Sequence, residues 1–432
     1  MSIGTFNAKS RSFTLALAAM TAVLVFSIIL FPEQAFQSSL NGLNIWWNVV
    51  FPSLLPFLMI GELMAGFGAV HALGTLMEPL MRPLFRIPGA GGWAIALGSV
   101  AGMPAGAEVA GKLRLENQIS REEGERLLAV SHVASPFFIL AVIGVGFLHS
   151  VETGAAIAII HYLSALGTGL LLRFGPRGAR KDETSDIAEP LPFKSKAYIK
   201  EEKKTPLLLR AYRAMHAARL EDGRSLGKLL GDAVTRSIQT LMMIGGYMIV
   251  FSVILGVLET VNIYSALQAF LSLFMPEAVR SGETMRSVAA ALLEQHVGAY
   301  RFGNLPYSDM MKAALIGAAL GWSGFAVHFQ VQTVIRGTDL RYKPFLVSRF
   351  VHAALAFVLT FALWSPLTEA LGRLIPGISP AAAGFGTGGR EPVHFTDVWM
   401  NLPDRLFQLL VLVACLLLIS AVAAAAGKFR KG

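Results

Sequence analysis

The chain has 432 residues, of which 54% are hydrophobic and 15% charged, and its mean hydropathy is +0.56. Soluble domains carry charge on about 25% of their residues, so the composition excludes a soluble enzyme or binding module and indicates a polytopic membrane protein. The formal net charge of +9 does not indicate a nucleic-acid partner. The basic residues flank apolar segments, where they favour the cytoplasmic side and anionic lipid headgroups.

Apolar segments of membrane-spanning length recur along the first half. The first, residues 12–31, has no charged residue over about 20 positions, which is enough to cross a bilayer core of roughly 30 Å. It lacks a small-residue cleavage site, so we expect an anchor rather than a removed signal peptide. The half is also predicted to contain an amphipathic stretch at 36–50, an interfacial helix at 74–87, and spans at 51–70, 127–148 and 153–172.

The segment 89–111 is as hydrophobic as a span but contains several glycines, a proline and an acid. Gly102, Pro104 and Gly106 favour a broken helix, because glycine permits unusual dihedrals and proline removes a hydrogen-bond donor. In lipid, such backbone persists only where protein buries it or where it lines a watery cavity. Glu108 is costly there and is a candidate for substrate binding, cation coordination or proton relay. The alternatives are helix packing through the glycines and a carboxyl that reaches the interface.

A hydrophilic region at 173–236 divides the chain nearly in half. It is rich in lysine and proline and has no phosphate loop or metal-ligand spacing, so it predicts a basic cytoplasmic linker with short helices at about 206–220 and 226–236. The second half is predicted to contain spans at 237–258, 345–365 and 404–425, a short apolar helix at 263–275, a weak apolar stretch at 286–300 and a segment at 310–335. The single cysteine, Cys415, forms no metal or redox pattern.

The two halves resemble each other at an offset of 222 residues, from 102 to 324. The pairs at this offset are Gly102 with Gly324, Glu108 with Gln330, Val109 with Val331 and Arg114 with Arg336. Secondary transporters often contain such repeats, with broken helices in corresponding positions and the site at the repeat interface. The sequence therefore predicts an all-α, polytopic transmembrane protein with two homologous repeats, each with a broken or re-entrant segment.

Charge leaves the topology of the second half open. If 89–111 is re-entrant from the cytoplasm, the basic residues around it and the central basic region lie inside, as the positive-inside rule favours. The span at 51–70 then runs inward and its counterpart at 237–258 outward, as in an inverted repeat. Strict inversion through the second half would place the basic tail at 428–431 outside, whereas a full crossing by 310–335 would place it inside.

Three stretches match a known family: GLNIWWNVVFPSLLPF at 42–57, GSVAGMPAGAE at 98–108 and LGWSGFAVHFQ at 320–330. Together they resemble the YlbJ (SpoVV) family of sporulation integral membrane proteins, which carry nucleoside-recognition Gate domains and are distantly similar to concentrative nucleoside transporters. The stretch 293–298 departs from the family pattern, because it has the Glu and the Gly but lacks the Thr-rich run expected after the Glu.

This resemblance implies re-entrant hairpins that bind substrate and a location in the outer forespore membrane or the cell membrane. It also implies a role in spore cortex formation through movement of dipicolinic acid toward the forespore. The expected division is an anchor helix at 1–35, a first Gate-type repeat at 36–172, a basic cytoplasmic linker at 173–236, a second Gate-type repeat at 237–370, and a loop with a C-terminal transmembrane helix at 371–432.

The candidate substrate-binding residues are polar or helix-breaking positions in or beside the apolar segments. They are Asn48, Ser53, Gly102, Pro104, Gly106, Glu108, Glu294, Gln295, His296, His328, Gln330, Gln332 and Arg336. Glu294, Gln295 and His296 face the same cavity as Glu108 or form a water-exposed turn. His328, Gln330 and Gln332 share one face only if the backbone is extended; otherwise they form interhelical hydrogen bonds.

Other intramembrane polar residues have two interpretations. Glu62 is a candidate second proton or ion site, and Arg349, like Arg336, either attracts an anion or reaches the interface. Two further polar sets are His132 with Ser131 and Ser135, and His161 with Ser164. Their histidines either titrate near neutral pH or form hydrogen bonds between helices. Trp46 and Trp47 indicate an interfacial aromatic belt.

These features favour a secondary transporter or facilitator for a small polar, anionic metabolite, bound between the repeats, with membrane lipid as a further partner. No cofactor is expected beyond a coupling Na⁺ or H⁺, and a homo-oligomer is left open. The alternatives are a nucleoside transporter and a non-transporting scaffold for spore-envelope assembly. An intramembrane enzyme is disfavoured, because the spans contain no paired Asp, Ser–Lys or His–Glu–x–x–His arrangement.

Overall fold

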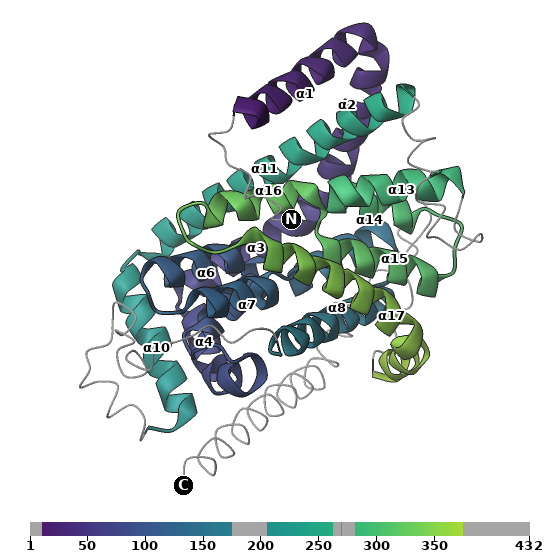
Figure 1. Ribbon diagram of the computed structural model, residues 1–432. Helices are drawn as coiled ribbons and strands as arrows, with labels where there is room; N and C mark the ends of the chain where they lie inside the picture. Colours follow the sequence, from purple (N-terminus) through teal and green to yellow (C-terminus); the bar gives the residue numbers. More distant parts are fainter. Residues whose placement is uncertain (1–10, 175–204, 262–268, 270–280, 375–432) are drawn as a thin grey trace.

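The computed structural model describes residues 11–174, 205–261, 269 and 281–374, and all its regular elements over these residues are helical (Figure 1). In the first half they are α1 (Arg11–Leu30), α2 (Pro32–Ile45), η1 (Trp46–Val50), α3 (Phe51–Gly66), α4 (Ala69–Leu80), η2 (Met81–Phe85), α5 (Gly91–Ala101), α6 (Ala105–Leu115), α7 (Arg121–Ser131), η3 (Phe138–Phe147) and α8 (Val151–Leu172). In the second they are α10 (Leu207–Asp222), α11 (Leu226–Thr260), α13 (Gly282–Leu293), α14 (Gln295–Gly303), α15 (Asp309–Trp322), α16 (Gly324–Ile335) and α17 (Tyr342–Leu374).

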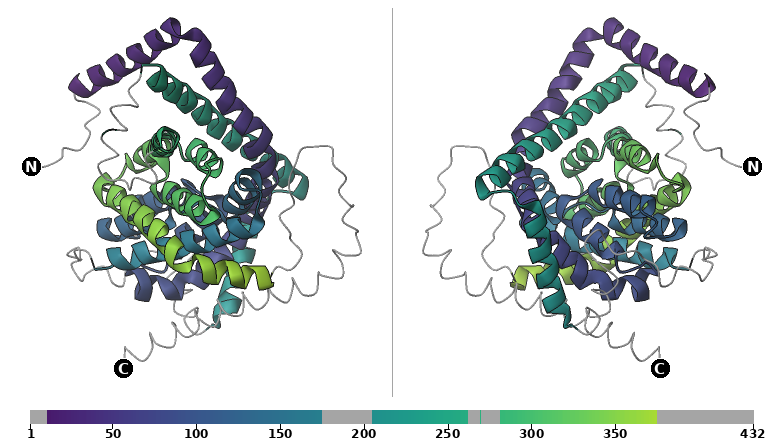
Figure 2. Two further views of the ribbon diagram at one scale, coloured as in Figure 1. Left: turned by 90° about the vertical axis from the view of Figure 1, so that its right-hand side faces the viewer. Right: turned by 90° about the vertical axis from the view of Figure 1, so that its left-hand side faces the viewer.

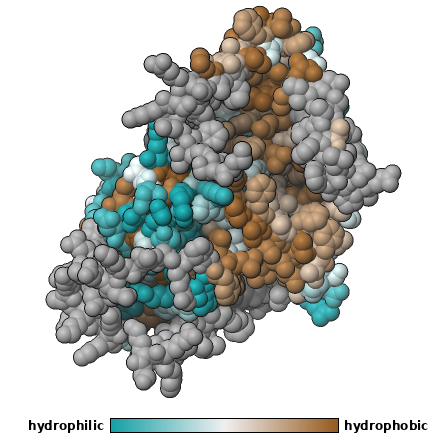
Figure 3. All heavy atoms as spheres, in the orientation of Figure 1, coloured by the Kyte–Doolittle hydropathy of each residue, from teal (hydrophilic) through white to brown (hydrophobic). Residues whose placement is uncertain are grey.

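Five helices of the described part are long and apolar enough to cross a membrane: Pro32–Gly66, Val151–Leu172, Leu226–Thr260, Asp309–Ile335 and Tyr342–Arg373. Hydrophobic residues cover the upper and right-hand parts of the face in Figure 3, whereas hydrophilic residues gather on its left. The predicted all-α, polytopic membrane class is confirmed. The expected segments at 263–275, 404–425 and 428–431, and Cys415, lie outside the described residues.

The helix formed by α2, η1 and α3 runs antiparallel to α11. Ser38 meets Gly256 at one end of the pair, and Gly66 meets Leu229 at the other. Figure 2 shows α1 and α2 with the end of α11 at the top of the molecule. The first part of α11 is the helix expected at 226–236, which runs without a break into the expected span at 237–258.

These two helices define the two ends of the molecule. The basic end carries α10 and the start of α11, which belong to the basic stretch 173–236; Arg210 of α10 pairs there with Glu78 of α4. The far end carries the start of α2 and the end of α11. Because positive charge favours the cytoplasm, the basic end is the expected cytoplasmic side.

Two helical hairpins enter the molecule from these opposite ends. In the first, α5 packs against α6, and Lys112 near the end of α6 lies 5.7 Å from the ring centre of Trp93 near the start of α5. Gly89, just before α5, packs against Glu78, which pairs with Arg210 at the basic end. The open side of the hairpin therefore faces the basic end, and its tip is at 102–104. In the second, α13 packs against α14, and Arg286 pairs with Glu259 at the far end, 3.1 Å away. Its tip is at Glu294.

The expected span at 127–148 is wrong as an unbroken helix. α7 begins at Arg121 and ends at Ser131, residues 132–135 are not helical, and π-helical turns follow in η3. The break has a local cause, because Pro136 lacks an N–H and disfavours helical dihedrals in the residue before it. The Ser135 hydroxyl then accepts from the Phe138 N–H at 3.2 Å.

The segment expected at 310–335 consists of α15 and α16, separated at Ser323 and Gly324, whose φ angles are 76° and 71°. It leads from the turn after α14, at the far end, to the turn before α17, where Arg114 pairs with Asp339 at the basic end. It is therefore long enough and correctly placed to cross. The extended backbone considered for His328, Gln330 and Gln332 is wrong, because all three lie in α16; positions two apart on a helix point in different directions.

The two halves contain the same order of elements. This order pairs different residues from those paired by the sequence offset of 222. A hairpin is followed by an interrupted helix and then a long helix: α5–α6, α7–η3 and α8 in the first half, α13–α14, α15–α16 and α17 in the second. In this order the tip at Gly102 corresponds to the tip at Glu294, whereas the offset of 222 pairs Gly102 with Gly324. The sequence repeat stays a prediction.

Candidate substrate site

A cavity of about 310 Å³ lies where the two hairpin tips approach each other. Its polar lining comes from both tips, from the break after α7, and from α3, α11 and α16. These residues are Glu62, Glu108, Ser135, Ser237, Thr240, Tyr247, Glu294, Gln295, His296 and Gln330. Clefts that hold small molecules typically measure about 300–1,000 Å³, so the volume suits a small metabolite.

The first tip contributes backbone and one carboxylate. Gly102 has φ 79° and ψ −164°, a combination almost restricted to glycine, and it packs beside Ser135 of the interrupted helix. Pro104 precedes α6 and lines the cavity, as does Glu108 one turn later. Among the described residues, the Glu108 carboxylate has no recorded hydrogen-bond or ion-pair partner, and it is exposed toward the cavity. It is therefore available to a ligand in the cavity.

The second tip is a closed hydrogen-bonded unit. The Glu294 side chain is 2% exposed and caps α14 by accepting from the Val297 N–H at 2.8 Å. Its other oxygen lies 2.5 Å from Nδ1 of His296. Gly324 of the α15–α16 break packs directly against Glu294, since a Cβ added at Gly324 would lie 3.1 Å from the Cα of Glu294. Each tip therefore contacts the break of an interrupted helix.

Two cavity atoms are left for a ligand to satisfy. The Gln295 carbonyl Oε1 and the Ser237 hydroxyl are buried and have no hydrogen-bond partner in the described part of the chain. Buried polar atoms are nearly always hydrogen-bonded, so a ligand or solvent is the expected partner. Glu62 is instead paired with Arg236, 3.5 Å away, at the side of the cavity nearer the basic end.

The structure brings together seven of the predicted site residues: Gly102, Pro104, Glu108, Glu294, Gln295, His296 and Gln330. The other six lie elsewhere. Asn48 lines a second cavity, Ser53 and Gln332 are partly buried outside both cavities, and Arg336 is exposed beyond α16.

Gly106 packs against Ser131, where a Cβ would lie 2.3 Å from the carbonyl oxygen; this is the helix-packing alternative. His328 is buried and bonds the Tyr342 hydroxyl at 2.7 Å and the Trp322 carbonyl at 2.9 Å, so it joins helices instead of facing the cavity.

The sequence reasoning missed Thr240 and Tyr247, which face the cavity from α11. They lie seven residues apart, two helical turns, and so share one face. A polar residue repeated at this spacing within an apolar span was the signal that could have identified them.

A single buried arginine and a histidine lie behind the break at 132–135. Arg349 is fully buried and donates to the carbonyls of His132 at 2.7 Å and Ala129 at 2.5 Å. These are orphan carbonyls at the end of α7, so Arg349 holds the interrupted helix rather than facing the cavity. The His161 ring accepts from the Ala134 N–H at 3.1 Å and thereby holds the same break.

Comparison with known proteins now decides the family. Residues 47–154 match the family model "Gate: Nucleoside recognition", which covers α3, the first hairpin and the interrupted helix. The sporulation integral membrane protein YlbJ of Bacillus subtilis (strain 168) is 38% identical over 361 residues, 84% of this chain and 85% of that protein. The chain belongs to the YlbJ family. It is an integral membrane protein, and no solved structure matches it.

Proposed function

We propose that this chain is a secondary transporter or facilitator for a small polar metabolite, which binds between the two hairpin tips. One observation carries the proposal: tips from opposite ends of the molecule meet at a polar cavity of about 310 Å³. A site at the membrane midplane between helix breaks is the arrangement by which secondary transporters alternate access. Rocking one hairpin against the other would open the cavity to each side in turn.

The substrate that we propose first is a small aromatic dicarboxylate, with dipicolinic acid as the candidate implied by the resemblance to sporulation proteins. Ser135, Thr240, Tyr247 and Gln330 offer neutral hydrogen bonds to such a molecule. Glu108 is the candidate for coupling transport to H⁺ or Na⁺, because a proton or cation there would offset the charge of a bound anion.

A nucleoside is the second candidate substrate. The matched family model is described as nucleoside recognition and covers the first tip. A nucleoside is neutral, and it fits a cavity whose carboxylates Glu62 and Glu294 already have cationic or imidazole partners, Arg236 and His296.

The test is uptake of labelled dipicolinate and labelled nucleosides by the purified protein in liposomes. We expect saturable uptake of one of them, and a loss of about tenfold or more in Glu108→Gln and Glu294→Gln, because both remove charge at the cavity. Glu369→Gln is the matched control, since Glu369 is exposed on α17 and lies outside both cavities.

A non-transporting scaffold makes the opposite prediction. In a spore-forming host, Glu108→Gln and Glu294→Gln at unchanged protein levels would then leave cortex formation intact. That result, together with no uptake of either substrate by the wild-type protein, would remove the transporter proposal.

A further inference from the structure

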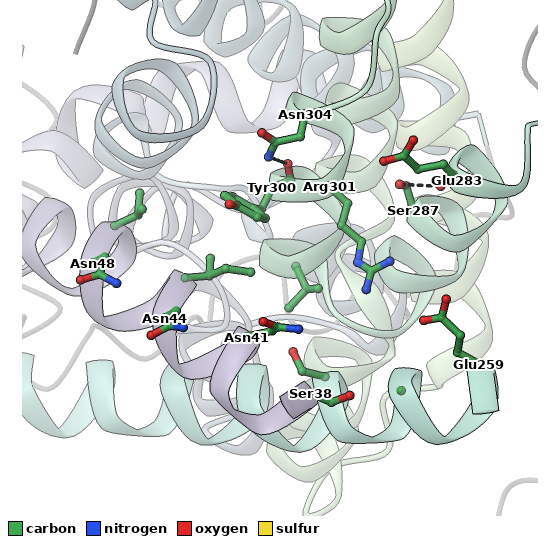
Figure 4. Close-up of a pocket in the computed structure, with 15 residues that line it drawn as sticks. Ser38, Asn41, Asn44, Asn48, Glu259, Glu283, Ser287, Tyr300, Arg301 and Asn304 are labelled. Carbon is green, nitrogen blue, oxygen red and sulfur yellow. Dashed lines mark hydrogen bonds between the residues drawn. The ribbon is translucent and has the colours of Figure 1, made fainter. Parts of the chain in front are cut away.

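A second and larger cavity, of about 600 Å³, lies at the far end. Its polar lining is Ser38, Asn41, Asn44, Asn48, Ser252, Glu259, Glu283, Ser287, Tyr300, Arg301 and Asn304 (Figure 4). Apart from Asn48, none of these residues belongs to the predicted site. The cavity is therefore a separate feature that the proposed transport site does not account for.

The amides come from one face of a helix long enough to span a membrane. Asn41, Asn44 and Asn48 are three and four residues apart, the spacing of neighbours on a helix surface. Figure 4 shows them in a row along α2 and η1, below Tyr300 and Arg301 of α14. Polar side chains in a membrane helix face protein, water or a ligand rather than lipid, so this face indicates a solvated or ligand-filled space.

The two cavities lie one beyond the other along the same pair of helices. α11 lines the first with residues 237–247 and the second with residues 252–259. The second hairpin tip stands between them, because His296 lines the first cavity and the next residue, Val297, lines the second. Trp46 packs against Leu241 and Gly245 of α11: it is buried, and its indole N–H donates to the Leu241 carbonyl at 2.8 Å.

The charges of the second cavity single out one cation. Glu259 is paired with Arg286, 3.1 Å away. Glu283 lies in the first turn of α13, where the helix dipole stabilises a negative charge. Arg301 extends from α14 into the space above the asparagine row (Figure 4), and among the described residues it has no carboxylate within ion-pair distance. The first cavity offers no such group, since its Arg236 neighbour is paired with Glu62.

We propose that this cavity is a second ligand site on the same pathway, in which Arg301 binds a carboxylate of the substrate and the amides of the asparagine row bind its remaining polar atoms. The ligand class is a small carboxylate that carries further hydrogen-bonding groups. This inference rests on the proposed transport function. A guanidinium suits a carboxylate because it can donate two parallel hydrogen bonds. The site faces the far end, so it receives substrate leaving the first cavity or loads substrate returning to it.

The first test is uptake of labelled dipicolinate into phosphatidylcholine liposomes, in which no anionic headgroup competes for Arg301. We expect Arg301→Gln to raise the KM by about tenfold, the effect of losing a charge-assisted hydrogen bond, and Arg301→Lys to recover part of it. Lys312→Gln is the matched control, a cation removed one turn into α15, outside both cavities. Fluorescence-detected size exclusion confirms folding of each variant.

The second test reads occupancy directly. In a Cys415→Ser background, Asn48→Cys should react with a membrane-impermeant thiol reagent from the far side, and dipicolinate should slow that reaction. Uptake by the wild type with an unchanged KM in Arg301→Gln and no protection at position 48 overturns the second site alone. No uptake of any carboxylate by the wild type overturns the carboxylate transport proposal and this inference with it.

Discussion

The two hairpin tips meet at one cavity but are built in different ways. The first tip, at Gly102 and Pro104, has no side-chain hydrogen bond of its own in the described structure, and its acid, Glu108, points toward the cavity without a recorded partner. The second tip is tied together by Glu294, which bonds both His296 and the Val297 N–H. One tip is therefore free to respond to a ligand, whereas the other is held by its own polar network.

Under the proposed transport function, this difference would give the two tips distinct tasks. A buried and satisfied network is rigid and costly to break, so the second tip suits a fixed wall between the two cavities. An unpartnered carboxylate changes its charge and contacts with little structural cost, so the first tip suits the coupling step. Each tip can be tested by substitution, and the variants are ordered from the largest expected effect, whether on stability or on transport, to the smallest.

Glu294→Ala should be the most damaging single change. It removes a helix cap worth about 0.5–2 kcal/mol and leaves Nδ1 of His296 buried without its partner, which costs about 1–3 kcal/mol more. Thermal unfolding followed by tryptophan fluorescence in detergent should show a clear fall in Tm. Glu294→Gln keeps an acceptor for Val297 and should lose less. Equal stability of Glu294→Ala and the wild type would contradict the closed-network description.

The two positive-φ glycines should differ in how they couple to that network. Alanine at Gly102 or Gly324 strains the backbone by about 1–3 kcal/mol. At Gly324 the new Cβ would also lie 2.9 Å from the backbone nitrogen of Gln295. At Gly102 the nearest atom to the new Cβ is the backbone nitrogen of Ser135, 3.5 Å away. Residues in contact show non-additive effects, so Gly324→Ala should couple to Glu294→Ala.

A double-mutant cycle measures this difference. Unfolding free energies from detergent titration should give a coupling of about 0.5 kcal/mol or more between Gly324→Ala and Glu294→Ala. For Gly102→Ala and Glu294→Ala they should add within about 0.3–0.5 kcal/mol. Coupling of the same size in both cycles would show that the two tips act as one unit and do not have distinct tasks.

Glu108→Gln should leave stability nearly unchanged while it impairs transport. In the described structure the Glu108 carboxylate has no hydrogen-bond or ion-pair partner that the substitution would remove. Substitutions of exposed residues without such partners usually change stability by less than about 0.5 kcal/mol. Accumulation driven by an ion or pH gradient should fall, whereas exchange at equal gradients should persist. A large drop in Tm would instead identify Glu108 as a structural residue.

The sequence predicted those parts of the molecule that have a local chemical cause. Gly102 and Pro104 interrupt an apolar run, and Glu294 interrupts another, so both breaks were readable from residue types alone. The interruption after α7 was missed although Pro136 marks it, because the surrounding run is apolar enough to hide one proline.

Long-range packing explains the remaining differences. Gly106 and His328 have the same residue types as true cavity residues, but Ser131 and Tyr342 from other helices occupy the space beside them. The asparagine face of α2 was visible only as an amphipathic stretch, because the sequence does not show that α14 brings Arg301 opposite it. Which polar residue faces a cavity depends on the neighbouring helix, not on its own spacing.

The smallest effect is expected at the base of the first hairpin. Arg114 at the end of α6 pairs with Asp339 in the turn before α17 at 2.7 Å, and this hydrogen bond holds the pKa of Asp339 below its ordinary value. A lowered carboxylate pKa stabilises the fold above the unfolded value of about 3.9 and loses that contribution as the pH falls through the folded value. Because the pair is partly exposed, Asp339→Asn should cost only about 0.2–1 kcal/mol.

The measurement is the Tm of Asp339→Asn and wild type from pH 7 down to pH 3. The difference should be present at neutral pH and vanish in acid, and high salt should reduce it. If Asp339→Asn destabilises the protein as much as Glu294→Ala, then the first hairpin is held at its base as firmly as the second is at its tip. The first tip would then have a fixed support, and the coupling step would have to lie in Glu108 alone rather than in movement of the hairpin.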